Sequence, residues 1–134
     1  MFVPLDDAVA RDLGVAARLA HRKSLPLLAG RLAVGEGVAL VTTGIVDRRR
    51  PVLVLVALTD RRVLVAGAQL RTSYVRSVAY RDIIDVASHR DLLKRGRPLE
   101  LHTATDRFKL HITGRKDFDE RLRELAGLAT TPTP

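Results

Sequence analysis

The chain has 134 residues, of which 46% are hydrophobic, and its formal net charge is +8. This length suits one domain with a single core, and the hydrophobic content excludes an intrinsically disordered chain. The absence of cysteine excludes disulfides, thiolate metal ligands and cysteine nucleophiles. The charge-free stretch 37–46 is far shorter than a membrane-spanning helix, and the N-terminus lacks the basic-then-apolar order of a signal peptide. We therefore expect a soluble, cytoplasmic protein.

The positive charge comes from 23 Lys and Arg residues against 15 Asp and Glu residues. It is spread along the chain rather than gathered in a tail, and it favours anionic partners through long-range attraction. Biased codon usage in an Arg- and Ala-rich chain would give the same excess without any selected basic surface. Charge alone therefore leaves both explanations open.

Residues 5–22 have apolar side chains at the three- and four-residue spacing of an amphipathic helix. Gly14 weakens this helix, and Pro26 ends the pattern. Residues 27–34 are predicted to form either a short connector or one further helical turn.

From residue 37 the pattern changes to short β-branched runs separated by polar stretches. The first five predicted strands cover 38–41, 52–56, 61–65, 73–80 and 83–88. Thr59 and Asp60 make a tight hairpin break, with Asp60 accepting backbone hydrogen bonds, and Gly67 and Gln69 are predicted to turn the chain again.

Two further strands form a last hairpin, with Thr105 and Asp106 as its central residues. In this register Leu101 faces Leu110 on the core side. The opposite side is polar and carries Glu100, His102, Arg107, Lys109 and His111. One face of the hairpin is therefore expected in the core and the other in water.

A helical pattern then closes the chain. Its apolar side carries Phe118, Leu122, Leu125 and Leu128. Asp117 and Glu120 have the spacing of a capping box. The sequence thus predicts a mainly β fold, a barrel or bent antiparallel sheet of about seven strands, with an N-terminal amphipathic helix and a C-terminal helix as its cap.

Two segments in this order, 58–65 and 78–83, resemble those of bacterial pleckstrin-homology-like domains, in particular those preceded by a helical segment. Gly35 and Glu36 match the glycine and glutamate that the family commonly shows before its first strand, whereas Ala79 stands where a proline is frequent. The resemblance implies a pleckstrin-homology-like domain over 34–129. A helical segment packed on the barrel (1–33) and a frayed tail (130–134) complete the predicted organisation.

Catalytic and metal-binding patterns are weak. A Gly-x-Ser-x-Gly nucleophile motif and a phosphate-binding loop are absent from the sequence. His102, His111 and Glu100 form the best metal-like cluster, but a lysine is expected opposite His102, where it would repel a cation. Asp82 and Asp85 could be imagined as an acid–base pair, but Asp82 fits better as an acceptor of backbone hydrogen bonds at the corner before the fifth strand. We therefore expect no cofactor, no bound metal and no enzymatic activity.

Basic residues supply the candidate binding site. They are Arg48, Arg49 and Arg50 between the first two strands, Arg61 and Arg62 at the neighbouring hairpin, and Lys94, Arg95 and Arg97 before the last hairpin. In the family that the chain resembles, some members bind phosphorylated lipid headgroups through basic residues of the first strand loop. The three arginines 48–50 match this location without a full motif. The competing interpretation is a solvated loop that keeps the domain soluble.

The second strand is apolar on both faces, so something must cover its outer face. We favour the N-terminal helix, and a second subunit is the alternative.

These patterns favour a non-catalytic adaptor whose partner is a protein or an anionic membrane surface, the latter placing it peripherally at the inner membrane. The alternative is a non-specific nucleic-acid-binding protein, although the chain offers few aromatic side chains for base stacking. A small enzyme is the third hypothesis.

Overall fold

The computed structural model describes residues 1–46, 48, 50–69, 71–88 and 97–128. The helical elements are α1 (Leu5–Asp12), α2 (Val15–Ala20), α3 (Ser24–Arg31), the 3-10 turn η1 (Tyr80–Asp82) and α4 (Phe118–Leu125). The strands are β1 (Val38–Val46), β2 (Val52–Thr59), β3 (Arg62–Gln69), β4 (Thr72–Ala79), β5 (Ile83–Ser88), β6 (Arg97–Thr103) and β7 (Arg107–Ile112).

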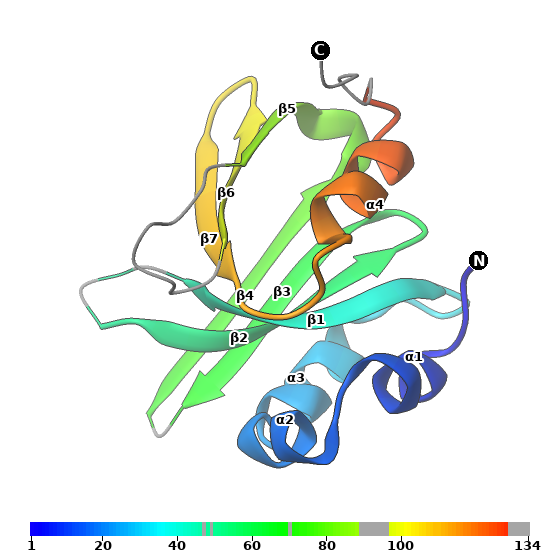
Figure 1. The fold of residues 1–134 in the computed structure, drawn as a ribbon, viewed down its shortest axis with the longest axis vertical. Coiled ribbons are helices and arrows are strands. Elements are labelled where there is room, and N and C mark those ends of the chain that lie inside the picture. The colour runs from blue at the N-terminus through cyan, green and yellow to red at the C-terminus, as the bar shows by residue number, and fades with distance from the viewer. Residues whose placement is uncertain (47, 49, 70, 89–96, 129–134) are drawn as a thin grey trace.

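The strands form one antiparallel sheet in the order β4-β3-β2-β1-β7-β6-β5. Strands β1 to β4 form a meander, η1 carries the chain to the other edge, and β7 returns to pair with β1. Figure 1 shows the sheet strongly bent, with α4 at the opening between β5–β7 and the meander. The predicted fold class, a bent seven-stranded antiparallel sheet with a C-terminal helix and a helical N-terminus, is confirmed.

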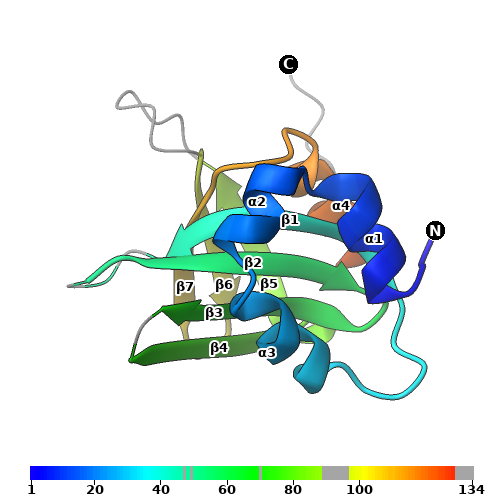
Figure 2. The ribbon, with the colours of Figure 1, turned by 90° about the horizontal axis from the view of Figure 1, so that it is seen from below.

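The structure has two apolar cores instead of the expected single core, because alternate residues of β2 and β3 face opposite sides of the sheet. The inner core lies inside the bend and joins Val54 and Val56 to Phe118 of α4. The outer core joins Leu55 and Leu28, together with further residues of α1, α3, β1 and β3. Figure 2 shows α1–α3 lying over the sheet face that forms this outer core. The chain's own helices therefore cover most of the outer face of β2.

The N-terminal region contains three short helices instead of one helix over 5–22. Leu13 leaves the helical conformation, and Gly14 forms the N-cap of α2. Of the two structures predicted for 27–34, the helical one is correct, because α3 begins at Ser24, runs through Pro26 and ends at Arg31. Proline is tolerated in the first turn of a helix, where its missing N–H would have no intrahelical partner.

The predicted turn at Gly67 and Gln69 is also wrong, because both residues lie in β3 and pair with β4. Gly67 is required for a different reason. An ideal Cβ at this position would lie 2.5 Å from the backbone oxygen of Leu53 on β2. The glycine therefore permits a close approach of two strands rather than a change of direction.

The last hairpin has a register two residues away from the predicted one. Leu101 pairs with Phe108 rather than Leu110, and Ala104 and Thr105 are the central residues of the turn. A shift of two residues leaves every side chain on its predicted face, because the side-chain period of a strand is two. The apolar side of the hairpin is buried in the inner core as expected.

Helix α4 begins at Phe118 as predicted, but without the predicted capping box. Asp117 occupies the N-cap position and makes no side-chain capping hydrogen bond. Its carboxylate instead accepts two hydrogen bonds from Arg115, at 2.9 and 2.8 Å. An arginine two residues away thus replaces the backbone amide as the partner of this carboxylate.

Candidate anion-binding site

The predicted basic residues do not converge on one surface. Arg50 lies just before β2, whereas Arg61 and Arg62 lie just after it, at the opposite end of this eight-residue strand. Consecutive connections of an antiparallel meander alternate between its two ends, as Figure 1 shows. The β3–β4 connection therefore lies on the side of Arg50, and the β2–β3 turn does not.

Arg62 has a structural partner. Its guanidinium donates two hydrogen bonds to the carboxylate of Glu36, at 3.0 and 2.8 Å, and the Glu36 side chain is fully buried. The same carboxylate accepts hydrogen bonds from the Thr59 hydroxyl at 2.6 Å and from the Ala33 amide at 2.9 Å. Burial favours the neutral acid, but these hydrogen bonds and the charge of Arg62 outweigh it and lower the pKa of Glu36 to about 2.

This cluster also explains the short signatures that resemble the pleckstrin-homology-like family. Gly35 has a φ of +77°, in the left-handed region that favours glycine, immediately before the buried Glu36. Thr59 holds the hairpin turn, because its hydroxyl accepts the amides of Arg61 and Arg62 at 3.1 and 3.0 Å. The Asp60 carboxylate accepts a backbone hydrogen bond, as predicted, and its donor is the Gly37 amide at 3.4 Å. These residues therefore maintain the fold.

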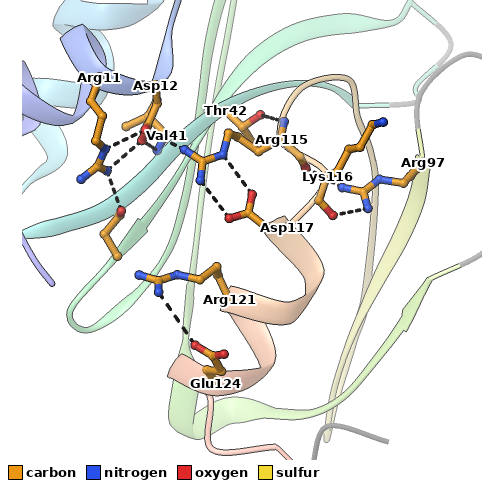
Figure 3. Close-up of polar contacts among 11 residues, drawn as sticks. Arg11, Asp12, Val41, Thr42, Arg97, Arg115, Lys116, Asp117, Arg121 and Glu124 are labelled. Atoms are coloured by element: carbon orange, nitrogen blue, oxygen red, sulfur yellow. Dashed lines mark hydrogen bonds and ion pairs between the residues drawn. The ribbon is translucent and has the colours of Figure 1, made fainter. Parts of the chain in front are cut away.

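The other predicted cations occupy separate places. Arg61 is exposed, and its Nε lies 3.5 Å from a carboxylate oxygen of Asp60. The guanidinium carbon of Arg48 lies over the ring of Tyr74, 5.3 Å from the ring centroid. Arg97 donates to the backbone oxygens of Lys116 and Arg115 at 2.6 and 2.5 Å (Figure 3). Three further predicted site residues lie outside the described residues: Arg49, Lys94 and Arg95.

Arg50 does meet other cations, at a hollow of about 540 Å³. Lys23 reaches it from the α2–α3 junction, and Arg71 reaches it from the β3–β4 connection. The remaining lining residues are Pro51, Val52, Gln69 and Thr72. We call this feature the basic hollow. Three segments distant in the sequence thus place cationic side chains around one concave surface.

The positive charge of the basic hollow is not neutralised by the described part of the chain. Lys23, Arg50 and Arg71 are exposed, form no ion pair with a described residue, and have no carboxylate among the residues that line the hollow. Acidic side chains elsewhere lie beside arginines: Asp12, Glu36, Asp106 and Asp117. A concave surface lined by charges of one sign attracts counter-ions most strongly.

Sequence reasoning missed Lys23 and Arg71. The alternation of the meander connections identifies Arg71, because the connection after β3 must return to the end where β2 begins. Lys23 has no comparable local signal, since its position depends on how the helices pack on the sheet. The Ala68 amide donates to the Ser24 hydroxyl at 3.0 Å, which fixes the start of α3 beside β3 and so places Lys23.

A second polar cluster holds α1 against the sheet (Figure 3). The buried carboxylate of Asp12 accepts hydrogen bonds from Arg11 at 2.7 Å, from Arg115 at 2.8 Å and from the Val41 amide at 2.9 Å. Burial opposes ionisation of Asp12, but these hydrogen bonds and charges outweigh it and hold the pKa of the carboxyl below its usual range. This cluster joins α1, β1 and the β7–α4 connection, and it therefore positions the helical segment.

The histidines of the last hairpin do not gather into a metal centre. Nε2 of His102 lies 2.8 Å from a carboxylate oxygen of Glu100, and the strand partner of His102 is Arg107. Within the described ranges, no group of three or more His, Cys, Asp or Glu side chains is arranged to hold a metal ion. No helix formed by the described residues is long and apolar enough to cross a membrane.

Comparisons with known proteins identify the fold that this chain shares with solved structures. The chain matches no protein-family model and no curated protein. It is similar to the C-terminal domain of an unknown protein from Leishmania infantum, with a TM-score of 0.59 and 17% identity over 81% of this chain and 96% of that chain.

Two bacterial structures are also similar. A pleckstrin homology domain from Shewanella amazonensis has a TM-score of 0.52 and 14% identity over 75% of this chain and 93% of that chain. A DUF1696 family protein with a pleckstrin-homology domain from Shewanella loihica has a TM-score of 0.53 and 13% identity over 94% of this chain and 92% of that chain. The chain therefore has the fold of the bacterial pleckstrin-homology-like domains, as the short sequence signatures implied.

Proposed function

We propose that the chain is a binding module whose basic hollow contacts the phosphate groups of an anionic membrane surface. One observation carries the proposal: Lys23, Arg50 and Arg71 come from three separate segments and face one hollow, and none of the described residues that line it is a carboxylate. The pleckstrin-homology-like fold supports a binding role in general, but a fold does not specify a ligand.

The expected attraction is weak and depends on salt. Each Lys or Arg near an acidic leaflet contributes about 1 kcal/mol, so the three cations of the hollow contribute about 3 kcal/mol together. Because charges are screened over about 8 Å at physiological ionic strength, only cations held close to the lipid phosphates contribute. This energy suits reversible, peripheral association.

Nucleic acid is a less suitable polyanion for this surface. Single strands are held partly by the stacking of bases on aromatic side chains. The ring of Tyr74 is already covered by Arg48 of the β1–β2 connection. A protein partner is the remaining alternative, and the experiment below separates the three.

The test is co-sedimentation with vesicles of phosphatidylcholine, with and without phosphatidylserine, at physiological salt. We expect the wild type to sediment only with the acidic vesicles, and Arg50→Glu/Arg71→Glu to lose this binding. The control Arg61→Glu/Arg81→Glu makes the same charge change at exposed residues away from the hollow and should bind like the wild type.

A duplex DNA of random sequence is tested in parallel. Wild type that binds neither polyanion, or two variants that bind acidic vesicles equally, would refute the proposal. Binding to DNA alone would assign the surface to nucleic acid.

A further inference from the structure

Helix α2 exposes apolar side chains beside the basic hollow. None of its residues is buried, and Val15 and Leu19 are 66% and 64% exposed. Side chains four residues apart lie on one side of a helix, so these two form a continuous apolar strip. A lone exposed leucine is ordinary, whereas adjacent exposed apolar side chains on one helix suit contact with a partner.

The strip is continuous with the basic hollow. Leu19 and Lys23 line a neighbouring hollow of about 480 Å³ together with Ala68 and Gln69 of β3. Lys23 and Gln69 also line the basic hollow. The apolar strip and the cationic lining are therefore parts of one surface.

β2 extends this surface. Leu53 lies on the outer face of β2, two residues before the fully buried Leu55, and is 42% exposed. Its backbone lies against Gly67 of β3, directly before Ala68. The helices cover the outer face at Leu55 but not at Leu53. Leu53 is therefore a third exposed apolar side chain, near the end of β2 where Arg50 lies.

The charge around the apolar strip has one sign. The sequence contains no Asp or Glu between Leu13 and Gly35. Arg18, Arg22 and Lys23 are exposed in and directly after α2, and they form no ion pair with a described residue. A second copy of the chain would bring these cations against one another, which disfavours self-association through this face.

We infer that α2 is the bilayer-contacting element of the protein: Val15 and Leu19 enter the interface of an acidic membrane while Arg22, Lys23 and the basic hollow contact the headgroups. This inference rests on the proposed function and extends it. A soluble phosphorylated anion would use the cations but not the exposed apolar strip. An interface that combines acyl chains with anionic headgroups matches both, and stable anchoring to a membrane generally takes two such signals.

Insertion of α2 into the membrane interface is tested with a tryptophan reporter, because the chain has no native tryptophan. Leu19→Trp should shift its fluorescence emission to the blue on acidic vesicles. The matched control Val34→Trp replaces another exposed apolar residue, in the connection between α3 and β1, and should not shift. Binding to acidic vesicles without a shift at position 19 would overturn the inference.

A second pair of variants tests the energetic contribution. Val15→Ser/Leu19→Ser should weaken binding to acidic vesicles at least tenfold, since each buried CH₂ contributes about 0.8 kcal/mol, and should leave the salt dependence unchanged. The control Val34→Ser/Ile84→Ser changes two exposed apolar residues of other segments and should bind normally.

The variants distinguish failure of the proposed membrane contact by the basic hollow from failure of the role inferred for α2. If Val15→Ser/Leu19→Ser binds as tightly as the wild type while Arg50→Glu/Arg71→Glu does not, the role of α2 is refuted and the basic hollow is supported. If the charge-reversed variant binds normally, the proposed function is refuted. Thermal unfolding of each variant confirms that these exposed substitutions leave the fold intact.

Discussion

Replacing Glu36 by glutamine tests the buried ion pair that holds the β2–β3 turn. The folded-state pKa of Glu36 is about 2, against an ordinary value of 4.5, and each pKa unit corresponds to about 1.4 kcal/mol. Ionised Glu36 therefore stabilises the fold by about 3 kcal/mol at neutral pH. We expect Glu36→Gln to lose about this amount at pH 7, in line with the cost of removing one partner from a buried pair.

The pH dependence has a defined sign. Because folding lowers the pKa, the stabilisation is complete above the unfolded pKa of 4.5 and is lost as the pH falls towards 2. The difference in unfolding free energy between wild type and variant should shrink from about 3 kcal/mol at pH 7 to about 1 kcal/mol at pH 3. Subtracting the unfolding free energy of the variant from that of the wild type removes the contributions of the other acids that have lowered pKa values.

Urea unfolding followed by far-UV circular dichroism at pH 7, 4 and 3 measures this difference. The control Glu120→Gln changes an exposed carboxylate in the first turn of α4 and should cost less than about 1 kcal/mol. A Glu36→Gln variant as stable as the control at pH 7, or a difference that stays constant down to pH 3, would refute the role assigned to this carboxylate.

Three further substitutions test other contacts by the same urea unfolding. Asp12→Asn should cost about 3 kcal/mol, because two arginines lose their buried anionic partner; an effect below about 1 kcal/mol would contradict this. Tyr80→Phe removes a buried 2.6 Å hydrogen bond to a backbone oxygen and should cost about 1–2 kcal/mol, with equal stability as the contrary result. Gly67→Ala should destabilise by about 1–3 kcal/mol, because its Cβ would lie 2.5 Å from the backbone oxygen of Leu53, whereas Gly30→Ala in α3 meets nothing within 4 Å and should stabilise by up to about 1 kcal/mol. Similar effects of the two alanines would contradict the argument from close approach.

The order of strands and helices follows from the sequence, because alternation and apolar spacing are local signals. The strand over 83–88 and the start of the last helix at Phe118 agree with the prediction. The register of the last hairpin differs, since several residues of the segment 103–106 suit a tight turn. The predicted faces of the side chains are nevertheless correct, because a register shift of two residues keeps each side chain on the same face of the sheet.

The local roles predicted for Gly67 and Pro26 are wrong, because tertiary packing decides which conformation each of these residues adopts. Gly67 reads as a turn residue, yet it lies within a strand where a neighbouring strand leaves no room for a Cβ. Pro26 reads as a helix terminator, yet it occupies the first turn of α3. Each residue type permits two structures, and only the packing around it selects one.

The binding surface was less predictable than the fold. Arg50 was identified because a basic run between two strands is a local feature, and Arg71 follows from strand alternation once the meander is known. Arg62 looked equivalent to these cations, but a buried glutamate 26 residues earlier binds it. Pairing between distant residues separates a structural arginine from an available one, and a single sequence does not display that pairing.

The two cores share the strands β2 and β3, and this has a consequence for the exchange of backbone amides with solvent. Residues 54–58 and 63–66 are fully buried whichever face their side chains occupy. If the helices separate from the sheet, the outer core is exposed, and if the bent sheet opens, the inner core is exposed. Because β2 and β3 contribute to both cores, either local opening disturbs the strands on which the other core depends. Amide protons in these central segments should therefore exchange only through global unfolding, and their protection should equal the full stability of the chain.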